Sequence, residues 1–211
     1  MNAGKSFEHQ FQKSLLKDKF YTLRLIDPPS SFGKDSTKVR FSAKNPYDFL
    51  AYKFPFLFCL ELKSVIGTSV SFQTEDEAEQ KQNTSANIKW HQTKSLLEAT
   101  KYFPVNAMFI INFRKTNNTY AIPVKDFVSF ITSVGFNKKS INECDCGMIG
   151  TLIPQKLNRT TYYYNFKSIY EMRCEALYSS EEDNEQDALN EESKIDCYTI
   201  DGEEIRLTKK R

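Results

Sequence analysis

The stretch Phe56-Leu57-Phe58-Cys59-Leu60-Glu61-Leu62-Lys63 is a dense run of apolar and aromatic residues that ends in charge. Such a run, which follows a bend at Lys53-Phe54-Pro55, predicts a buried β-strand. The preceding segment, Tyr47 to Tyr52, alternates in character and predicts a second strand, paired with the first as a hairpin. Because Asp48 lies 13 residues before Glu61, the hairpin is expected to bring these two carboxylates together.

Glu61 and Lys63 are expected side by side in one cleft, because residues i and i+2 of a strand point to the same face. Mg²⁺ prefers hard oxygen ligands, which Asp48 and Glu61 supply together with a scissile phosphate. Lys63 is then placed to hold the attacking water or to neutralise charge that grows on the phosphate. The three residues therefore predict a Mg²⁺-dependent phosphodiesterase site. Taken alone, so short a pattern favours ordinary polar residues at a strand end, because such strings are common by chance.

Further short motifs follow one another in a specific order along residues 1–165. They are Asn2-Ala3-Gly4-Lys5-Ser6-Phe7-Glu8, Asp27-Pro28-Pro29, Tyr47-Asp48, Glu61-Leu62-Lys63-Ser64, Thr68-Ser69-Val70-Ser71-Phe72 and Trp90-His91-Gln92. In this order, and with this spacing from Asp to Glu, they resemble the RecU family of Holliday junction resolvases, members of the PD-(D/E)xK nuclease superfamily. The resemblance implies a restriction-endonuclease-like α/β fold, in which helices flank a mixed sheet.

The resemblance also implies a function. The implied function is structure-selective endonuclease activity: a Holliday junction resolvase hydrolyses phosphodiester bonds in four-way DNA junctions during recombination and repair. Asp48, Glu61 and Gln92 are then expected to bind Mg²⁺, for which Mn²⁺ can substitute, and Lys63 to support the transition state. A homodimer is expected because two symmetric strands must be cut. Branched DNA and recombination proteins are the expected partners.

Two alternatives stay open. Within the enzymes, the alternative is a related nuclease that cuts other branched DNA or duplex DNA. From a different class comes a non-catalytic protein that keeps the fold and binds junctions, although the retained Asp48, Glu61 and Lys63 speak against it. A phage origin is one interpretation of the resemblance.

The chain departs from the RecU pattern at three places. Pro46 stands where the family commonly has a threonine that belongs to the metal site, so a backbone carbonyl would have to substitute. The segment that forms a junction-probing stalk in the family is shortened here to about residues 28–46, which puts junction selectivity in doubt. Residues 73–87 are a polar insertion, for which we predict a mobile surface loop.

The first helix is predicted from Lys5 to Lys19, because Phe7, Phe11 and Leu15 recur at helical spacing. Glu8 falls next to the core face of this helix. In the superfamily a helix acid near the amino terminus often faces the metal site, so Glu8 is a candidate catalytic residue. A solvated acid near a favourable helix end is an equally good interpretation.

Basic residues in several segments are the candidate DNA contacts outside the metal centre. In the shortened stalk they interleave with Phe32 and Phe41, which suits contacts with phosphates and wedging against bases. A solvated charged loop is the competing interpretation. The full set predicted to bind DNA is Lys5, Lys34, Lys38, Arg40, Lys44, Lys138 and Lys139.

Charge is distributed unevenly along the chain. Residues 1–177 contain 24 Lys and Arg against 16 Asp and Glu, a net of +8, whereas residues 178–211 contain 5 against 11, a net of −6. A basic body suits a polyanion, since each neutralised phosphate releases counterions. We therefore expect a nuclease domain at 1–177, an acidic linker at 178–194 and an appended β-hairpin at 195–211 around Asp201-Gly202.

Composition points to the reducing interior of a cell. The five cysteines are an odd number and predict reduced thiols. No apolar run approaches the roughly 20 residues that span a bilayer, and the amino terminus lacks a signal-peptide pattern. We expect a cytoplasmic protein without a membrane partner.

Overall fold

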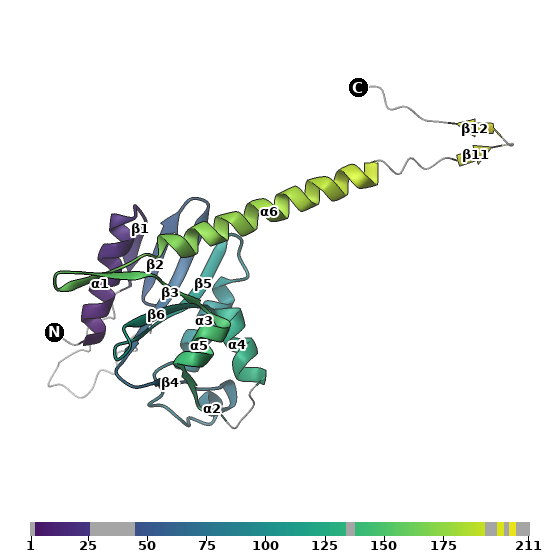
Figure 1. The fold of residues 1–211 in the computed structure, drawn as a ribbon. Coiled ribbons are helices and arrows are strands. Elements are labelled where there is room, and N and C mark those ends of the chain that lie inside the picture. The colour runs from purple at the N-terminus through teal and green to yellow at the C-terminus, as the bar shows by residue number, and fades with distance from the viewer. Residues whose placement is uncertain (1–2, 26–44, 134–137, 193–197, 201–202, 206–211) are drawn as a thin grey trace, which may run out of the picture. The chain divides into compact units, whose positions relative to one another are not determined.

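The computed structural model describes residues 3–25, 45–133, 138–192, 198–200 and 203–205, with side chains described as far as residue 179. The chain divides into two units, residues 1–170 and residues 171–211. The first unit contains the sheet and every candidate site residue that the structure describes (Figure 1).

A six-stranded sheet with the order β1-β2-β3-β5-β6-β8 forms the centre of the first unit. Its strands are β1 (Tyr21–Arg24), β2 (Phe49–Lys53), β3 (Phe56–Val65), β5 (Val105–Phe113), β6 (Asn118–Pro123) and β8 (Thr151–Leu152). Strands β3 and β5 run parallel, and the other neighbours are antiparallel. The sheet is therefore mixed, and the predicted hairpin is present as β2 and β3, with Phe49 opposite Leu60.

Helices cover both faces of this sheet (Figure 1). Helix α1 (Ala3–Lys17) covers one face, and α3 (Trp90–Ala99), α4 (Val124–Ser133) and α5 (Glu143–Ile149) cover the other. The predicted fold class, a mixed α/β sheet with flanking helices, is confirmed.

Aromatic side chains fill the space between α1 and the sheet. Phe11 of α1 is fully buried and packs against Phe166, with ring centroids 5.7 Å apart. Phe166 in turn packs edge-on against Phe58 of β3 at 5.2 Å. Edge-to-face geometry of this kind stabilises aromatic pairs beyond the area that they bury. The helical spacing of Phe7, Phe11 and Leu15 in the sequence therefore marks the buried face of α1, because all three are buried.

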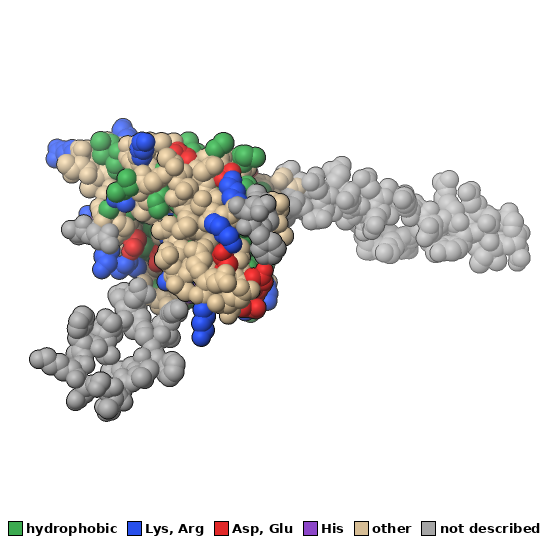
Figure 2. Space-filling model, turned by 90° about the horizontal axis from the view of Figure 1, so that it is seen from below, with side chains coloured by type: hydrophobic (Ala, Val, Ile, Leu, Met, Phe, Trp, Pro, Cys, Tyr) green, Lys and Arg blue, Asp and Glu red, His purple; other side chains and the backbone are tan. Residues whose placement is uncertain are grey.

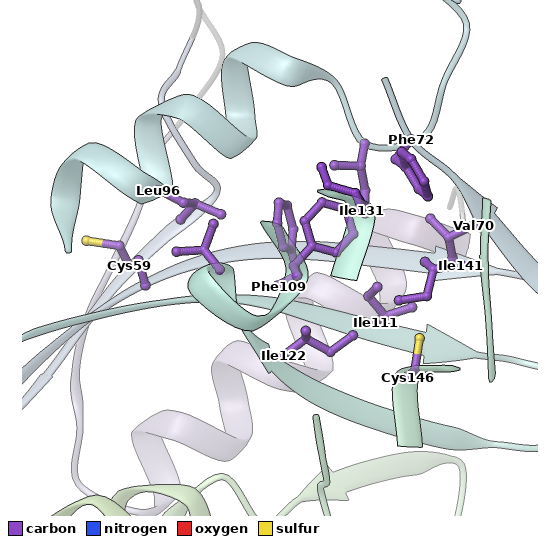
Figure 3. Close-up of a cluster of buried hydrophobic side chains, with 14 of the residues drawn as sticks. Cys59, Val70, Phe72, Leu96, Phe109, Ile111, Ile122, Ile131, Ile141 and Cys146 are labelled. Atoms are coloured by element: carbon purple, nitrogen blue, oxygen red, sulfur yellow. The ribbon is translucent and has the colours of Figure 1, made fainter. Parts of the chain in front are cut away.

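The larger core lies on the opposite face, under α3, α4 and α5 (Figure 3). Phe109 and Ile111 project from β5 into it, and Phe109 packs on Phe127 of α4 with ring centroids 4.8 Å apart. Leu96 of α3 completes this layer. Alternate side chains of β5 pack on opposite faces of the sheet, and both faces are covered, which explains why the strand is apolar almost throughout.

Residues 73–87, for which a mobile surface loop was predicted, contain a short helix, α2 (Glu75–Glu79). The Thr74 hydroxyl accepts from the Glu77 N–H, and the Glu77 carboxylate accepts from the Thr74 N–H. This reciprocal capping satisfies backbone groups at the helix start. Gln73 and Glu77 are buried, which attaches the segment to the body.

Two small strand pairs complete the first unit. They are β4 (Ser69–Ser71) with β7 (Ser140–Asn142), and β9 (Gln155–Asn158) with β10 (Thr161–Tyr164).

The second unit contains most of helix α6 and one strand pair. Helix α6 (Lys167–Glu192) runs on from the first unit, so most of the predicted acidic linker is helical. Strand β11 (Tyr198–Ile200) pairs antiparallel with β12 (Glu203–Ile205), inside the segment predicted as a hairpin. Among the described helices, none combines the length and the apolar character that crossing a bilayer requires.

Two glycines near α5 provide a matched test of packing. A Cβ added at Gly150 would lie 2.7 Å from Cγ1 of Ile122 and 2.9 Å from two carbonyl oxygens, whereas one added at Gly147 would meet only a Tyr120 ring carbon at 3.8 Å. We expect Gly150→Ala to lower the free energy of unfolding by about 1–3 kcal/mol through overpacking. Gly147→Ala, inside α5, should raise it by about 0.5–1 kcal/mol. Urea denaturation of both variants checks this, and equal stabilities would contradict the packing.

Candidate active site

Asp48 and Glu61 face each other across the β2–β3 hairpin. Phe49 pairs with Leu60, and one further step along the same register brings Asp48 opposite Glu61. The hairpin is held there by the Asp48 N–H, which donates to the Leu60 carbonyl at 3.0 Å, and by the Leu62 N–H, which donates to Oδ2 of Asp48 at 2.8 Å. The backbone of β3 therefore fixes the first carboxylate beside the second.

Glu61 is buried near the centre of the sheet, with 2% of its surface exposed. Its Oε1 lies 2.8 Å from Nζ of Lys63 and also accepts a hydrogen bond from Nε2 of Gln92. Burial is the main cause that raises the pKa of Glu61 to about 7; the charges of Asp48 and Glu8 contribute to this increase, and Lys63 opposes it. Near neutral pH this carboxyl is therefore poised between its charged and neutral forms.

Helix α3 places Gln92 above Glu61. The helix begins at Trp90, and Oε1 of Gln92 accepts from the backbone N–H of Lys89 at 3.0 Å. The amide nitrogen therefore points at Glu61. Rotation about the last side-chain bond exchanges the two ends of the amide and would turn its oxygen toward the carboxylates. Gln92 is thus an amide donor to Glu61 here, and that rotation would turn its oxygen toward the carboxylates in place of its nitrogen.

Glu8 lies at the margin of this group. Its Oε2 accepts from Nε of Arg24 at 3.1 Å, and Arg24 of β1 pairs with Phe49, the residue after Asp48. The charge of Glu8 also contributes to the raised pKa of Glu61. Sequence reasoning missed Arg24, because nothing local indicates that β1 brings it to α1.

A cavity of about 750 Å³ lies beside the carboxylates, between β3 and α3. Cys59, two residues before Glu61 on the same strand face, lines it together with Tyr47 and His91. A hydrogen bond joins the side chains of Tyr47 and Cys59, and burial together with this bond raises the pKa of Tyr47 to about 12. Both groups are therefore neutral at physiological pH. Pro46 also lines the cavity, at the position where the RecU pattern has threonine.

Three of the seven predicted DNA-binding residues, Lys5, Lys138 and Lys139, lie within the described residues. Lys138 forms an ion pair with Asp145 at 2.7 Å, and Lys139 forms one with Glu77 at 2.5 Å, so neither reaches the carboxylates of β2 and β3. Lys5 is exposed on α1. The remaining four, Lys34, Lys38, Arg40 and Lys44, lie outside the described residues.

Basic and acidic side chains are interspersed on the face of the molecule that Figure 2 presents. The positive excess of the body therefore does not form one continuous patch on that face.

The donor set fits a hard divalent cation. Within the described part of the chain, no three His, Cys, Asp or Glu side chains cluster closely enough to hold a metal by themselves. Asp48 and Glu61 supply two carboxylates, and the amide oxygen of Gln92 supplies a neutral third ligand after rotation. Oxygen donors of this kind match Mg²⁺, which keeps several waters and needs only one or two carboxylates.

The fold and this arrangement define a mixed α/β protein with two facing carboxylates, a lysine and an amide on one face of its central hairpin. The chain belongs to the family of the SPbeta prophage-derived uncharacterized protein YotM of Bacillus subtilis (strain 168). The two are 30% identical over 174 residues, which cover 77% of this chain and 82% of that protein.

No family model matches the chain. Among solved structures, it is similar to Hjc of Archaeoglobus fulgidus, a Holliday junction resolvase from an archaeal hyperthermophile. The TM-score is 0.44 at 15% identity, over 70% of this chain and 93% of that one.

Proposed function

We propose that the protein is a Mg²⁺-dependent endonuclease that cuts four-way DNA junctions. The observation that carries the proposal is the convergence of Asp48, Glu61, Lys63 and Gln92 on one face of the β2–β3 hairpin. A buried carboxylate with a pKa near 7 is costly to maintain, which is a mark of functional sites. The order of the RecU-like motifs along the sequence supports the choice of substrate.

In the proposed reaction, Asp48 and Glu61 would hold the cation, and the amide oxygen of Gln92 would be a third ligand after rotation. Bound Mg²⁺ supplies Lewis acidity at the scissile phosphate and lowers the pKa of water. Lys63, released from its ion pair with Glu61, orients the attacking water or offsets negative charge that grows on the phosphate. Glu8, which Arg24 holds in place, helps through its negative charge to position the cation at Asp48 and Glu61.

The proposed active molecule is a homodimer, because a four-way junction has two equivalent strands to cut. A twofold assembly presents two copies of the Asp48–Glu61 site to those strands. Mn²⁺ is proposed to substitute for Mg²⁺, because it accepts the same oxygen ligands. The proposed location is the cytoplasm, where recombining DNA and its proteins are available as partners.

A substrate comparison tests this function. The wild-type chain is incubated with Mg²⁺ and a labelled mobile four-way junction, a flap or a matched linear duplex, beside Asp48→Asn. Paired symmetric nicks in the junction alone, absent in Asp48→Asn, are the expected result. Equal cutting of the duplex would indicate a general nuclease in place of a junction resolvase. Tight junction binding without any cutting would favour the non-catalytic alternative.

A further inference from the structure

A second cavity, of about 380 Å³, lies on the opposite face of the sheet from Glu61. The α1 side of the sheet forms its wall, through Phe7 and Gln10 of the helix and through Ser64 and Asn112 of β3 and β5. Ser64 directly follows Lys63, so the cavity begins one residue beyond the candidate active site. It therefore lies near the carboxyl ends of the parallel strands β3 and β5.

Arg114 is the only cation among the residues that line this cavity, and no carboxylate lines it. The Nε atom of Arg114 is buried and has no hydrogen-bond partner among the described residues. No carboxylate in the described ranges forms an ion pair with its guanidinium, and the first turn of α1 contains no acid. A partly buried charge without a counterion is costly, so such groups usually serve to bind a ligand of opposite charge.

Hydrogen bonds hold the polar wall of the cavity in place. Ser64 donates to Oδ1 of Asn112 at 3.1 Å, and Nδ2 of Asn112 donates to the Thr119 hydroxyl at 2.9 Å. The Thr119 hydroxyl donates to Oε1 of Gln155 at 2.8 Å. These amides and hydroxyls are satisfied by one another, whereas the buried Nε of Arg114 has no hydrogen-bond partner among the described residues. The site is therefore shaped in advance for one anionic group.

We propose that Arg114 binds a backbone phosphate of the DNA strand that is being cut. The proposal rests on the proposed nuclease function for the identity of the anion. A planar guanidinium presents donors in a fork that matches two oxygens of one phosphate, which a lysine ammonium does not. A strand that passes the carboxyl ends of β3 and β5 reaches both Lys63 and the cavity, so the contact sets the register of the strand at the carboxylates.

Binding of a labelled junction, measured without metal over a range of salt concentrations, tests this proposal. The full chain is compared with Arg114→Gln, Arg114→Lys and the matched control Lys115→Gln, which removes the same charge from the exposed neighbouring residue. Arg114→Gln should weaken binding about tenfold or more, as expected for a charge-assisted hydrogen bond. It should also lower the salt slope by about 1. Arg114→Lys should restore the slope but only part of the affinity.

Thermal unfolding separates binding from folding, because removal of an unpaired charge should leave the Tm of Arg114→Gln at or above that of the wild type. If Arg114→Gln binds the junction as tightly as Lys115→Gln does, the proposal is overturned. Cleavage of the junction by the wild type with Mg²⁺ tests the nuclease function separately. Titration with inorganic phosphate distinguishes the source of the anion. If Arg114→Gln loses phosphate binding but keeps junction binding, the DNA contact is overturned.

Discussion

Glu61→Gln is expected to reduce junction cleavage by at least about a thousandfold, because a metal ligand that stabilises transition-state charge contributes several kcal/mol. The replacement changes few atoms and keeps an oxygen for Lys63 and Gln92, which both donate to Oε1 of Glu61. The fold should therefore persist while the charge that holds the cation is lost. Single-turnover cleavage of a labelled junction, at saturating protein, measures this effect apart from DNA binding.

Lys63→Gln is the matched partner of that variant. It should also lose most cleavage, since the ammonium group acts on the water or the phosphate, but it should bind the divalent cation as tightly as the wild type does, or more tightly. Lys63 competes with a cation for Glu61 in the metal-free protein, where the two form an ion pair at 2.8 Å. Cleavage by Glu61→Gln within about tenfold of the wild type would rule out Glu61 as a catalytic metal ligand.

The stability of the metal-free protein is expected to fall by about 2 kcal/mol as the pH rises from 5 to 8, when measured relative to Glu61→Gln. Burial raises the pKa of Glu61 from 4.5 to about 7 in the folded protein. Between these values the folded chain retains a proton that the unfolded chain has released, so the free energy of unfolding decreases with rising pH. Each pKa unit corresponds to about 1.4 kcal/mol, and most of this pKa shift is expressed between pH 5 and pH 8.

Comparison with Glu61→Gln removes the contribution of other titrating groups, such as Glu77, whose lowered pKa works in the opposite direction. Urea denaturation at several pH values, with and without Mg²⁺, gives the measurement. Mg²⁺ should restore the stability of the wild type at pH 8, because it binds the folded state alone. A difference between the two proteins that does not change with pH would contradict the raised pKa.

The hairpin and its carboxylates could be predicted from the sequence because their geometry is local. Asp48 directly precedes β2, Glu61 lies on β3, and a short turn joins the two strands, so strand periodicity alone brings the two residues together. The contact between Gln92 and Glu61 is not local, and only the resemblance to RecU pointed to it. Helix α2 was missed, although Thr74 and Glu77 have the spacing of a capping box that marks a helix start.

Contacts that depend on tertiary packing could not be predicted. The pair of Glu8 and Arg24 requires α1 to lie beside β1, and no periodicity in either segment indicates this. The same holds for the ion pair of Lys139 with Glu77, 62 residues away in the sequence, while the predicted DNA contact of Lys139 stays a prediction. The cavity around Arg114 is built from five separate segments, so it is visible only in the folded chain.

Calorimetric titration of the full chain with Mg²⁺, and with Mn²⁺ in parallel, tests the central claim most directly, since it requires neither a substrate nor an oligomeric state. One cation per chain should bind to the wild type and to Lys63→Gln, and binding should be lost in both Asp48→Asn and Glu61→Gln. Binding at pH 6.5 should also release a proton, because Glu61 has a pKa of about 7 and must ionise to hold the cation. Equal binding by the wild type and both carboxylate variants would contradict the assignment of this site.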